Sequence, residues 1–343
     1  MIVLDRKSGA QDSTDVSRRN KESIALNLKH ADGVAAAQKL INSADVLIEG
    51  FRPGVMEKLG LGPETLQQSN PGLIVGRMTG WGQTGPLAHT AGHDLNYLSI
   101  TGALHAIGRD GQPPIPPLNL VADYGGGAMF LLFGVLSALH ERSQSGRGQV
   151  VDVAMSEGVS AMMSIFHSLG AKGRWQVGRE RNLLDGGAPF YRCYETADGE
   201  SISVGALEPQ FFAELVERAG LPASDCDTRD APSNWAELHQ RYESVFKART
   251  RDEWVEIFNG SDACVAPVLS LDEVEAHPQN RARGTFIRHD GVMQAAPAPR
   301  FDRTPAATPN PPTAPGDATD KVLEELGYSA AQIEKMRSDH ALT

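Results

Sequence analysis

The sequence is poor in cysteine. Its three cysteines, Cys193, Cys226 and Cys264, lie far apart in the chain, and no two of them form a CxxC pair. This spacing argues against a disulfide framework and against a zinc site. We therefore expect three buried, reduced thiols and no bound metal ion.

Long apolar runs and a targeting pattern are also absent. The run from Phe130 to Leu136 is among the longest, and a membrane span needs roughly 18 or more such residues. The N-terminus lacks the basic and then apolar pattern of a signal sequence. These absences predict a cytoplasmic protein that does not bind membranes.

The chain has no excess of positive charge. Its formal net charge is −11, whereas nucleic-acid backbones are bound by an excess of Lys and Arg. We therefore expect no nucleic-acid partner. Residues 1–60 are an exception, with nine basic and eight acidic side chains. That stretch suits a small polyanion such as a nucleotide, although a solvated surface of mixed charge gives the same pattern.

Strand and helix patterns alternate in the first half of the chain. Met1–Asp5, Ala44–Glu49 and Leu73–Met78 are apolar runs of strand type, and residues 33–43 have the pattern of a helix. Strands that alternate with helices favour a parallel sheet. With 343 residues and 41% hydrophobic composition, the chain is long enough for two domains. We predict an α/β fold with a Rossmann-like large domain.

Two helices are expected to end this large domain. The first, 128–142, is predicted to start near Gly127, and the second, Ser156–Leu169, is rich in methionine that we interpret as core filler. The apolar face expected on the first helix comprises Met129, Leu132, Val135, Leu136 and Leu139.

The pattern changes at about residue 189. The triplet Ala197–Asp198–Gly199 is a hairpin signal between two short strands. Helices are expected at 209–219, 234–247 and 251–259, then a strand at Cys264–Leu269, an extended segment at 295–315 and a last helix at 317–337. This predicts a large domain over 1–188, a smaller α+β domain over 189–290 and a segment, 291–343, that returns to the large domain.

Three sites carry candidate chemistry. His93 and Asp94 lie in a glycine-flanked loop, AGHDLNY, although a lone loop histidine is more often plain polar surface. Asp123, in NLVADYGGG, lies just ahead of a predicted helix, where an N-cap is the alternative interpretation. Glu208 begins the first helix of the smaller domain, and a favourable helix-start acid would look the same.

His93 and Asp123 together suit proton transfer at a stereocentre, because one group removes a proton and the other returns it on the opposite face. A helix N-terminus would lower the pKa of Asp123 and an apolar pocket would raise it, and the sequence does not decide between them. The backbone N–H groups of Asp123 and the glycines after it could stabilise an enolate oxygen.

Several passages carry a family resemblance that covers nearly the whole chain. They are ADVLIEGFRPGVMEKLGLG, MTGWGQTGP, AGHDLNYLSITGALHAIG, PPLNLVADYGGGAMFLL, GQVVDVAMSEG, LLDGGAPFYRCYETADGE and VGALEPQF. In these passages the chain resembles the α-methylacyl-CoA racemases, CaiB/BaiF-type members of the family III CoA-transferase superfamily. The resemblance implies an isomerase of lipid metabolism that interconverts (2R)- and (2S)-2-methylacyl-CoA by proton transfer through an enolate.

The same resemblance implies roles for particular residues. His93 and Asp123 match the catalytic pair, Glu208 matches an acidic partner of the histidine, and Asp94 lies beside the site. It also implies an interlocked homodimer, in which the small domain of one chain closes the site of the other, and no cofactor beyond the CoA of the substrate. The positions that match CoA-binding residues are Arg6, Arg19, Leu26, Glu49, Gly50, Arg52 and Lys58.

Family members have a further strand, glycine-bearing loop and helix before the strand matched by Met1–Asp5. We therefore expect this chain to start at the second strand of the pattern, through a misplaced start codon. Two alternatives remain: a family III CoA-transferase in which Asp123 is the nucleophile, and a non-catalytic acyl-CoA binder that lacks the N-terminal unit. Branched fatty, bile-acid-type and aryl-propionyl groups are all compatible with the sequence.

Overall fold

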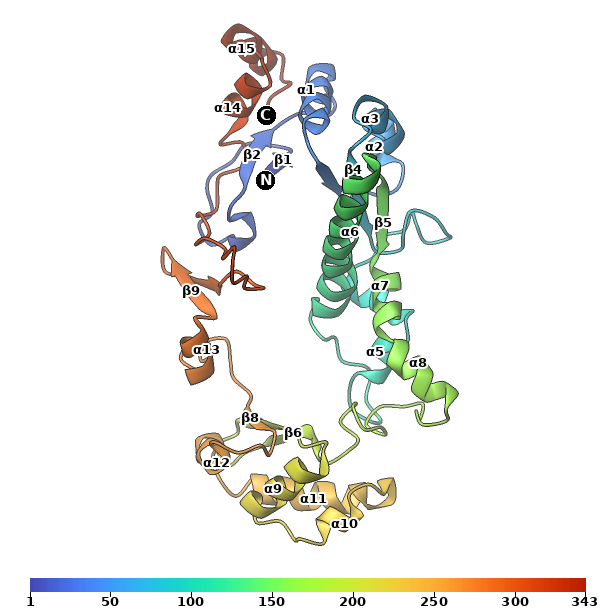
Figure 1. Cartoon of the computed structure of the whole chain (residues 1–343), viewed down its shortest axis with the longest axis vertical. Helices are drawn as coiled ribbons and strands as arrows, with labels where there is room; N and C mark the ends of the chain where they lie inside the picture. The colour runs from blue at the N-terminus through green and yellow to red at the C-terminus, as the bar shows by residue number, and fades with distance from the viewer. The chain divides into compact units, whose positions relative to one another are not determined.

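The computed structural model describes all residues from Met1 to Thr343 and divides into two compact units. Unit 1 comprises residues 1–89, 130–153 and 271–343, and unit 2 comprises 90–129 and 154–270. Both mix helices with strands, and the strands near the N-terminus pair in parallel (Figure 1). The predicted α/β class is confirmed, and the predicted domain boundaries stay a prediction.

Unit 1 contains two separate sheets with parallel pairs. In the first, β1 (Ile2–Asp5) pairs in parallel with β2 (Glu22–Ala25). In the second, β4 (Ile74–Thr79) lies between β3 (Val46–Glu49) and β5 (Val150–Ala154), and β3 and β4 run parallel. We did not predict β2. Its sequence, ESIA, has no apolar run, because Ser23 fills a fully buried position with a hydrogen-bonded hydroxyl.

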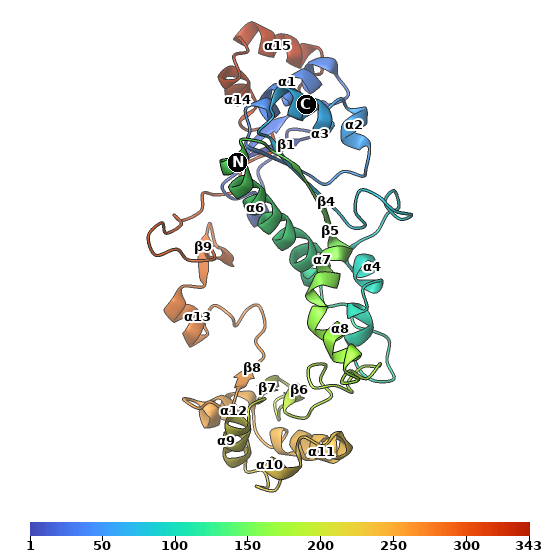
Figure 2. The same ribbon diagram turned by 45° about the vertical axis from the view of Figure 1, so that its right-hand side comes forward.

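Helices near both ends of the chain share one core. The core joins Ile24 of β2 and Leu66 to Leu323 and Met336, and Figures 1 and 2 show α14 and α15 beside α1. The predicted last helix is broken in two at Gly327, which has φ +84°. The helices and remaining strands of unit 1 are η1 (Val16–Arg18), α1 (Ala31–Asn42), α2 (Val55–Lys58), α3 (Pro63–Ser69), α6 (Phe130–Ser145), α13 (Pro278–Arg283), β9 (Phe286–His289), β10 (Val292–Ala295), α14 (Thr319–Glu325) and α15 (Ala330–Ser338).

The helix expected at 128–142 starts earlier than predicted. Wide π-type turns form η2 (Leu120–Met129), which leads into α6. Asp123 therefore lies in the first turn of a helix, and its interpretation as an N-cap is wrong. The physical reason is that the carboxylate of Asp94 accepts the N–H groups of Ala122 and Asp123 near the start of η2. Because these N–H groups have a partner, the helix can begin before the glycines.

The predicted apolar face of α6 is only partly buried. Val135 is buried, together with Leu131 and Ala138, whereas Leu132 and Leu136 of the predicted face are 52% and 65% exposed. The stretch Leu120–Ser145 is long and apolar enough to cross a membrane by length and composition. Core helices of soluble proteins pass the same test, so this is weak support for a span, and the expected absence of membrane binding stays a prediction.

Unit 2 carries the predicted hairpin, which turns at Gly199 with φ +80°. Its antiparallel sheet, β6 (Tyr191–Glu195), β7 (Ser201–Gly205) and β8 (Val265–Pro267), packs on helices through an aromatic core. Figure 2 shows α9, α11 and α12 beside this sheet. The helices of unit 2 are α4 (Asp94–Ser99), α5 (Ala103–Ala106), α7 (Met155–Met162), α8 (Ser164–Ala171), α9 (Pro209–Ala219), α10 (Asp225–Thr228), η3 (Pro232–Asn234), α11 (Trp235–Phe246) and α12 (Arg251–Phe258).

Two expectations about side chains in unit 2 need correction. Cys193, Cys226 and Cys264 are unpaired as expected, but all three are exposed rather than buried. The predicted Met-rich helix is interrupted at Met163. Met155 and Met163 pack against the core as expected, but Met162 is 43% exposed and is not core filler.

Candidate active site

His93 stands at the start of α4, as its N-cap residue. Its backbone N–H donates to Oδ1 of Asn96 at 3.0 Å, and the N–H of Asn96 donates back to the carbonyl of His93 at 2.8 Å. The imidazole is exposed. The loop thus fixes the backbone of His93 and leaves its ring available to a ligand.

Asp94 joins the histidine loop to the helix that carries Asp123. Its side chain is 6% exposed, and its Oδ2 accepts hydrogen bonds from the N–H groups of Ala122 at 2.9 Å and of Asp123 at 2.8 Å. An ionised carboxylate is a strong acceptor and complements the positive end of η2. His93 precedes this carboxylate in the chain and Asp123 is bonded to it, so one buried group brings the two predicted catalytic residues together.

The carboxylate of Asp123 is half-buried and receives one hydrogen bond, from Nδ2 of Asn119 at 3.2 Å. Its own N–H is already bonded to Asp94. Our prediction that this N–H would stabilise an enolate oxygen is therefore wrong for the structure described here. The side chain keeps free acceptor capacity and can exchange a proton with a ligand.

Glycines allow η2 to pack closely on α7. A Cβ at Gly126 would lie 2.6 Å from the carbonyl oxygen of Met155, and a Cβ at Gly158 would lie 2.0 Å from the carbonyl oxygen of Gly126. Side chains larger than hydrogen do not fit at either position. Close backbone contact, together with the core that includes Ala122 and Val159, holds the helix start on which Asp123 stands.

Glu208 does not meet His93 within one chain. It is the exposed N-cap residue of α9, and its carboxylate makes no hydrogen bond and no ion pair. Pro209 follows at the first helical position, where its missing N–H costs nothing. The partnership with His93 that the family resemblance implies is therefore not formed inside this chain.

Three of the seven predicted CoA positions are exposed where strands of unit 1 end. Arg6 directly follows β1, and Gly50 and Arg52 follow β3. Lys58, at the end of α2, is also exposed. In parallel α/β sheets ligands bind outside the carboxyl ends of the strands, so these residues lie where an anionic ligand is expected.

The other three positions are occupied within the chain. The side chain of Leu26 is 1% exposed in the core. Arg19 donates from Nη1 to Oε1 of Gln294 at 2.8 Å and to the carbonyl of Ala295 at 2.7 Å. Glu49 is buried and accepts the N–H of Phe51 at 2.7 Å. These side chains are engaged within the chain rather than facing open solvent.

Arg77 is a buried charge that we did not predict. Its guanidinium bonds Glu49 at 2.6 Å and Glu57 at 2.8 Å, so it links β4, the end of β3 and α2. Burial works to lower the pKa of Arg77, but the two carboxylates outweigh it and raise that pKa. The available signal was one arginine inside the apolar run LIVGRM, because a buried strand charge needs a partner.

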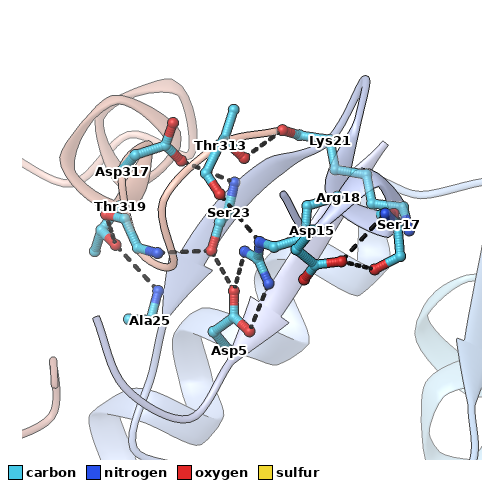
Figure 3. Close-up of polar contacts among 11 residues, drawn as sticks. Asp5, Asp15, Ser17, Arg18, Lys21, Ser23, Ala25, Thr313, Asp317 and Thr319 are labelled. Atoms are coloured by element: carbon cyan, nitrogen blue, oxygen red, sulfur yellow. Dashed lines mark hydrogen bonds and ion pairs between the residues drawn. The ribbon is translucent and has the colours of Figure 1, made fainter. Parts of the chain in front are cut away.

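Figure 3 shows a second network, around the end of β1. Arg18 pairs with Asp5 at 2.7 Å, and the hydroxyl of Ser23 donates to the same carboxylate at 2.5 Å. Nε of Arg18 also donates to the carbonyl of Thr313, and the N–H of Gly316 donates to Ser23. The C-terminal segment thereby fixes the turn between Arg6 and Arg19.

The fold and these strand-end sites are those of a CoA-transferase-type α/β protein. The family model for CoA-transferase family III matches residues 6–319, and the chain belongs to this family. It is 47% identical to the α-methylacyl-CoA racemase of Mus musculus over 94% of the chain and 85% of that protein. It is 44% identical to the α-methylacyl-CoA racemase of Homo sapiens over 95% and 86%. A CAIB/BAIF family protein from Brucella suis shares the fold, with a TM-score of 0.76, 23% identity and coverage of 95% and 91%.

Proposed function

We propose that this chain is a racemase of 2-methylacyl-CoA thioesters, an isomerase of lipid metabolism. The observation that carries the proposal is the carboxylate of Asp94, which ties the start of the His93 helix to the start of the Asp123 helix. Similarity to two proteins named α-methylacyl-CoA racemase supports the choice of substrate.

The proposed reaction exchanges one proton at the α-carbon. A neutral imidazole of His93, or an ionised Asp123 in the reverse direction, removes the proton, and the electron pair of the C–H bond moves into the thioester to form an enolate. The other residue, in its protonated form, then delivers a proton to the opposite face. Because the thioester itself acidifies the α-proton, the proposed reaction uses no metal and no redox cofactor.

The CoA part of the substrate is proposed to lie along the exposed cations of unit 1. Arg6, Arg52 and Lys58 are exposed at the ends of β1, β3 and α2. Arginine can bind a phosphate through two parallel N–H bonds, and lysine acts as a point charge. The neighbouring Glu49–Arg77 pair keeps its own charges satisfied, so the exposed cations are free to pair with phosphates.

We further propose that two copies of the chain form an interlocked homodimer in the cytoplasm, with no membrane or nucleic-acid partner. Glu208 is exposed and makes no hydrogen bond, and the ring of His93 is also exposed. In α6, Leu132, Phe133 and Leu136 are 52%, 73% and 65% exposed. A second copy could cover this apolar face and bring its Glu208 to His93.

Exchange of the α-proton is the test of the proposed reaction. The purified chain is incubated with one enantiomer of a 2-methylacyl-CoA in deuterated water, and deuterium uptake and configuration are followed by NMR. Uptake with inversion is expected, and His93→Ala and Asp123→Ala should each nearly abolish inversion. Inversion at the wild-type rate in either variant would contradict the two-base scheme.

Membership of CoA-transferase family III favours one second candidate, a CoA-transferase. In that reaction the carboxylate of Asp123 attacks the thioester carbonyl, the CoA thiolate leaves, and an acyl anhydride forms on the enzyme. A new thioester with an added free acid, without deuterium uptake, would identify this activity. Binding of the acyl-CoA with neither exchange nor transfer would identify a non-catalytic binder.

A further inference from the structure

Arg229 is a buried cation packed against two aromatic rings that contact each other. It is 5% exposed, and its guanidinium carbon lies 4.8 Å from the ring centroid of Phe190 and 4.6 Å from that of Phe212. Trp235 donates from Nε1 to the backbone carbonyl of Arg229 at 2.7 Å. Cation–π contacts are strongest where water is excluded, so this side chain has a single well-defined place in the core.

The guanidinium reaches the segment that leads to Glu208. Its Nη1 donates to the carbonyl of Ala206 at 3.1 Å, and its Nη2 donates to the carbonyl of Leu207 at 2.9 Å. On either side, the carbonyl of Gly205 accepts the N–H of Leu207, and the carbonyl of Glu208 accepts the N–H of Phe212. Every backbone carbonyl from 205 to 208 is thereby hydrogen-bonded.

The carboxylate at the end of this segment is left unbonded. Glu208 is exposed, and it lies close enough to Cys264 to help raise the pKa of that thiol, after burial, the larger cause. A fixed backbone with an unbonded side chain is the arrangement expected for a group that must meet its partner in one defined geometry.

We propose that Arg229 is a positioning residue for Glu208. The two Nη groups of its guanidinium fix the carbonyls of Ala206 and Leu207, so that the carboxylate of Glu208 projects in one direction from the start of α9. This inference rests on the proposed racemase function, in which Glu208 assists His93. Lysine cannot replace arginine here, because one ammonium group cannot bond two carbonyls in a plane and stack on two rings at once.

The test compares Arg229→Lys with a matched control, Arg218→Gln, in the full-length chain. Arg218 also donates to a backbone carbonyl, that of Ile257 at 2.8 Å, but it does not touch residues 206–208. We expect the lysine variant to keep its circular dichroism, and amide hydrogen exchange should rise in the peptide 205–212 alone. The kcat for α-proton exchange should fall by about 100-fold, with little change in KM, as for a misplaced catalytic group.

A double-mutant cycle links this effect to Glu208. Glu208→Gln combined with Arg229→Lys should be no slower than Glu208→Gln alone, because residues that act as one unit are not additive. Losses that multiply, a wild-type kcat in the lysine variant, or faster amide exchange throughout the protein would each overturn the proposal. Arg229→Gln, which keeps an amide donor without a buried charge, replaces the lysine variant if that variant does not fold.

Failure of the racemase function itself would look different. Absence of α-proton exchange in the wild-type protein would reject the proposed function, whereas the amide-exchange comparison at 205–212 would still decide whether Arg229 holds this segment. An unchanged exchange rate there in the Arg229 variants would reject the positioning role whatever the reaction.

Discussion

At the scale of single residues, the candidate site depends on a carboxylate that contacts backbone rather than substrate. Oδ2 of Asp94 accepts hydrogen bonds from two N–H groups at the start of η2. The family resemblance places Asp94 beside the catalytic pair. Its hydrogen bonds instead indicate that it holds the two proposed catalytic residues in place.

Replacement of Asp94 separates these two roles. Asp94→Ala leaves two buried N–H groups without an acceptor, which costs roughly 1–3 kcal/mol of folding free energy, and should lower kcat by about 100-fold through misplacement of Asp123. Asp94→Asn keeps an acceptor oxygen and should retain most of the folding free energy and most of kcat. Urea unfolding and α-proton exchange measure the two effects, and an alanine variant with full activity would contradict the anchoring role.

Asp5 gives the protein a defined response to acid. Burial works to raise the pKa of Asp5, but hydrogen bonds from Arg18 and Ser23 outweigh it and hold that pKa below the ordinary value for a carboxyl. The stability that this carboxylate contributes is therefore fully present above the ordinary carboxyl pKa. It is lost as the pH falls through the lower value of the folded state.

The prediction concerns Asp5→Asn. At neutral pH the variant should be less stable than the wild type by about 1–3 kcal/mol, as expected for hydrogen bonds to a charged group. The difference should shrink below about pH 4, where the wild-type carboxyl is protonated in the unfolded chain. Urea denaturation between pH 7 and pH 3 provides the measurement. If the difference in free energy of unfolding between the two proteins grew toward low pH, the prediction would be wrong.

At the scale of elements, local patterns predicted much of the fold. A run or period of apolar residues, or a turn signal, predicted each of these elements: β1, β3, β4, α1, α9 and the hairpin of β6 and β7. β2 was missed, because its buried Ser23 is made acceptable by Asp5 and Gly316. The early start of η2 depends on Asp94. The missed strand and the wrongly placed helix start therefore both result from contacts between residues far apart in the sequence.

The contact between η2 and α7 yields a prediction with its own control. Gly158→Ala places a methyl group against the backbone of Gly126 and should destabilise the protein by about 1–3 kcal/mol, as overpacking does. Gly170→Ala in α8 meets nothing within 4 Å and should stabilise the helix by about 0.5–1 kcal/mol. Urea unfolding of both variants gives the comparison. Equal changes in the free energy of unfolding would show that the contact between η2 and α7 tolerates a methyl group.

At the scale of the whole molecule, the question is which copy supplies Glu208. The sequence predicted α6 as an amphipathic helix, but apolar residues occupy more than its buried face, and Leu132, Phe133 and Leu136 are exposed. Pattern alone could not separate a face for the core from a face for a partner, because both are apolar at helical spacing.

Subunit mixing tests the proposed dimer. His93→Ala and Glu208→Gln should each be nearly inactive alone, but mixed dimers contain one site with both wild-type residues if Glu208 acts across the interface. After unfolding and refolding together, about a quarter of wild-type activity should return. Mixing His93→Ala with Asp123→Ala is the control and should restore nothing, because the carboxylate of Asp94 joins the segments of both residues within one chain. No recovery in the first mixture would mean that Glu208 does not act in trans.

The open edges of two sheets of unit 1, β1–β2 and β3–β4–β5, have a practical consequence. β1 pairs only with β2, and β3 pairs only with β4, while Ile2 and Ile48 on these edge strands are 38% and 50% exposed. Unpaired strand edges with apolar side chains recruit extended segments of other chains. The protein should therefore be prone to self-association that grows with concentration.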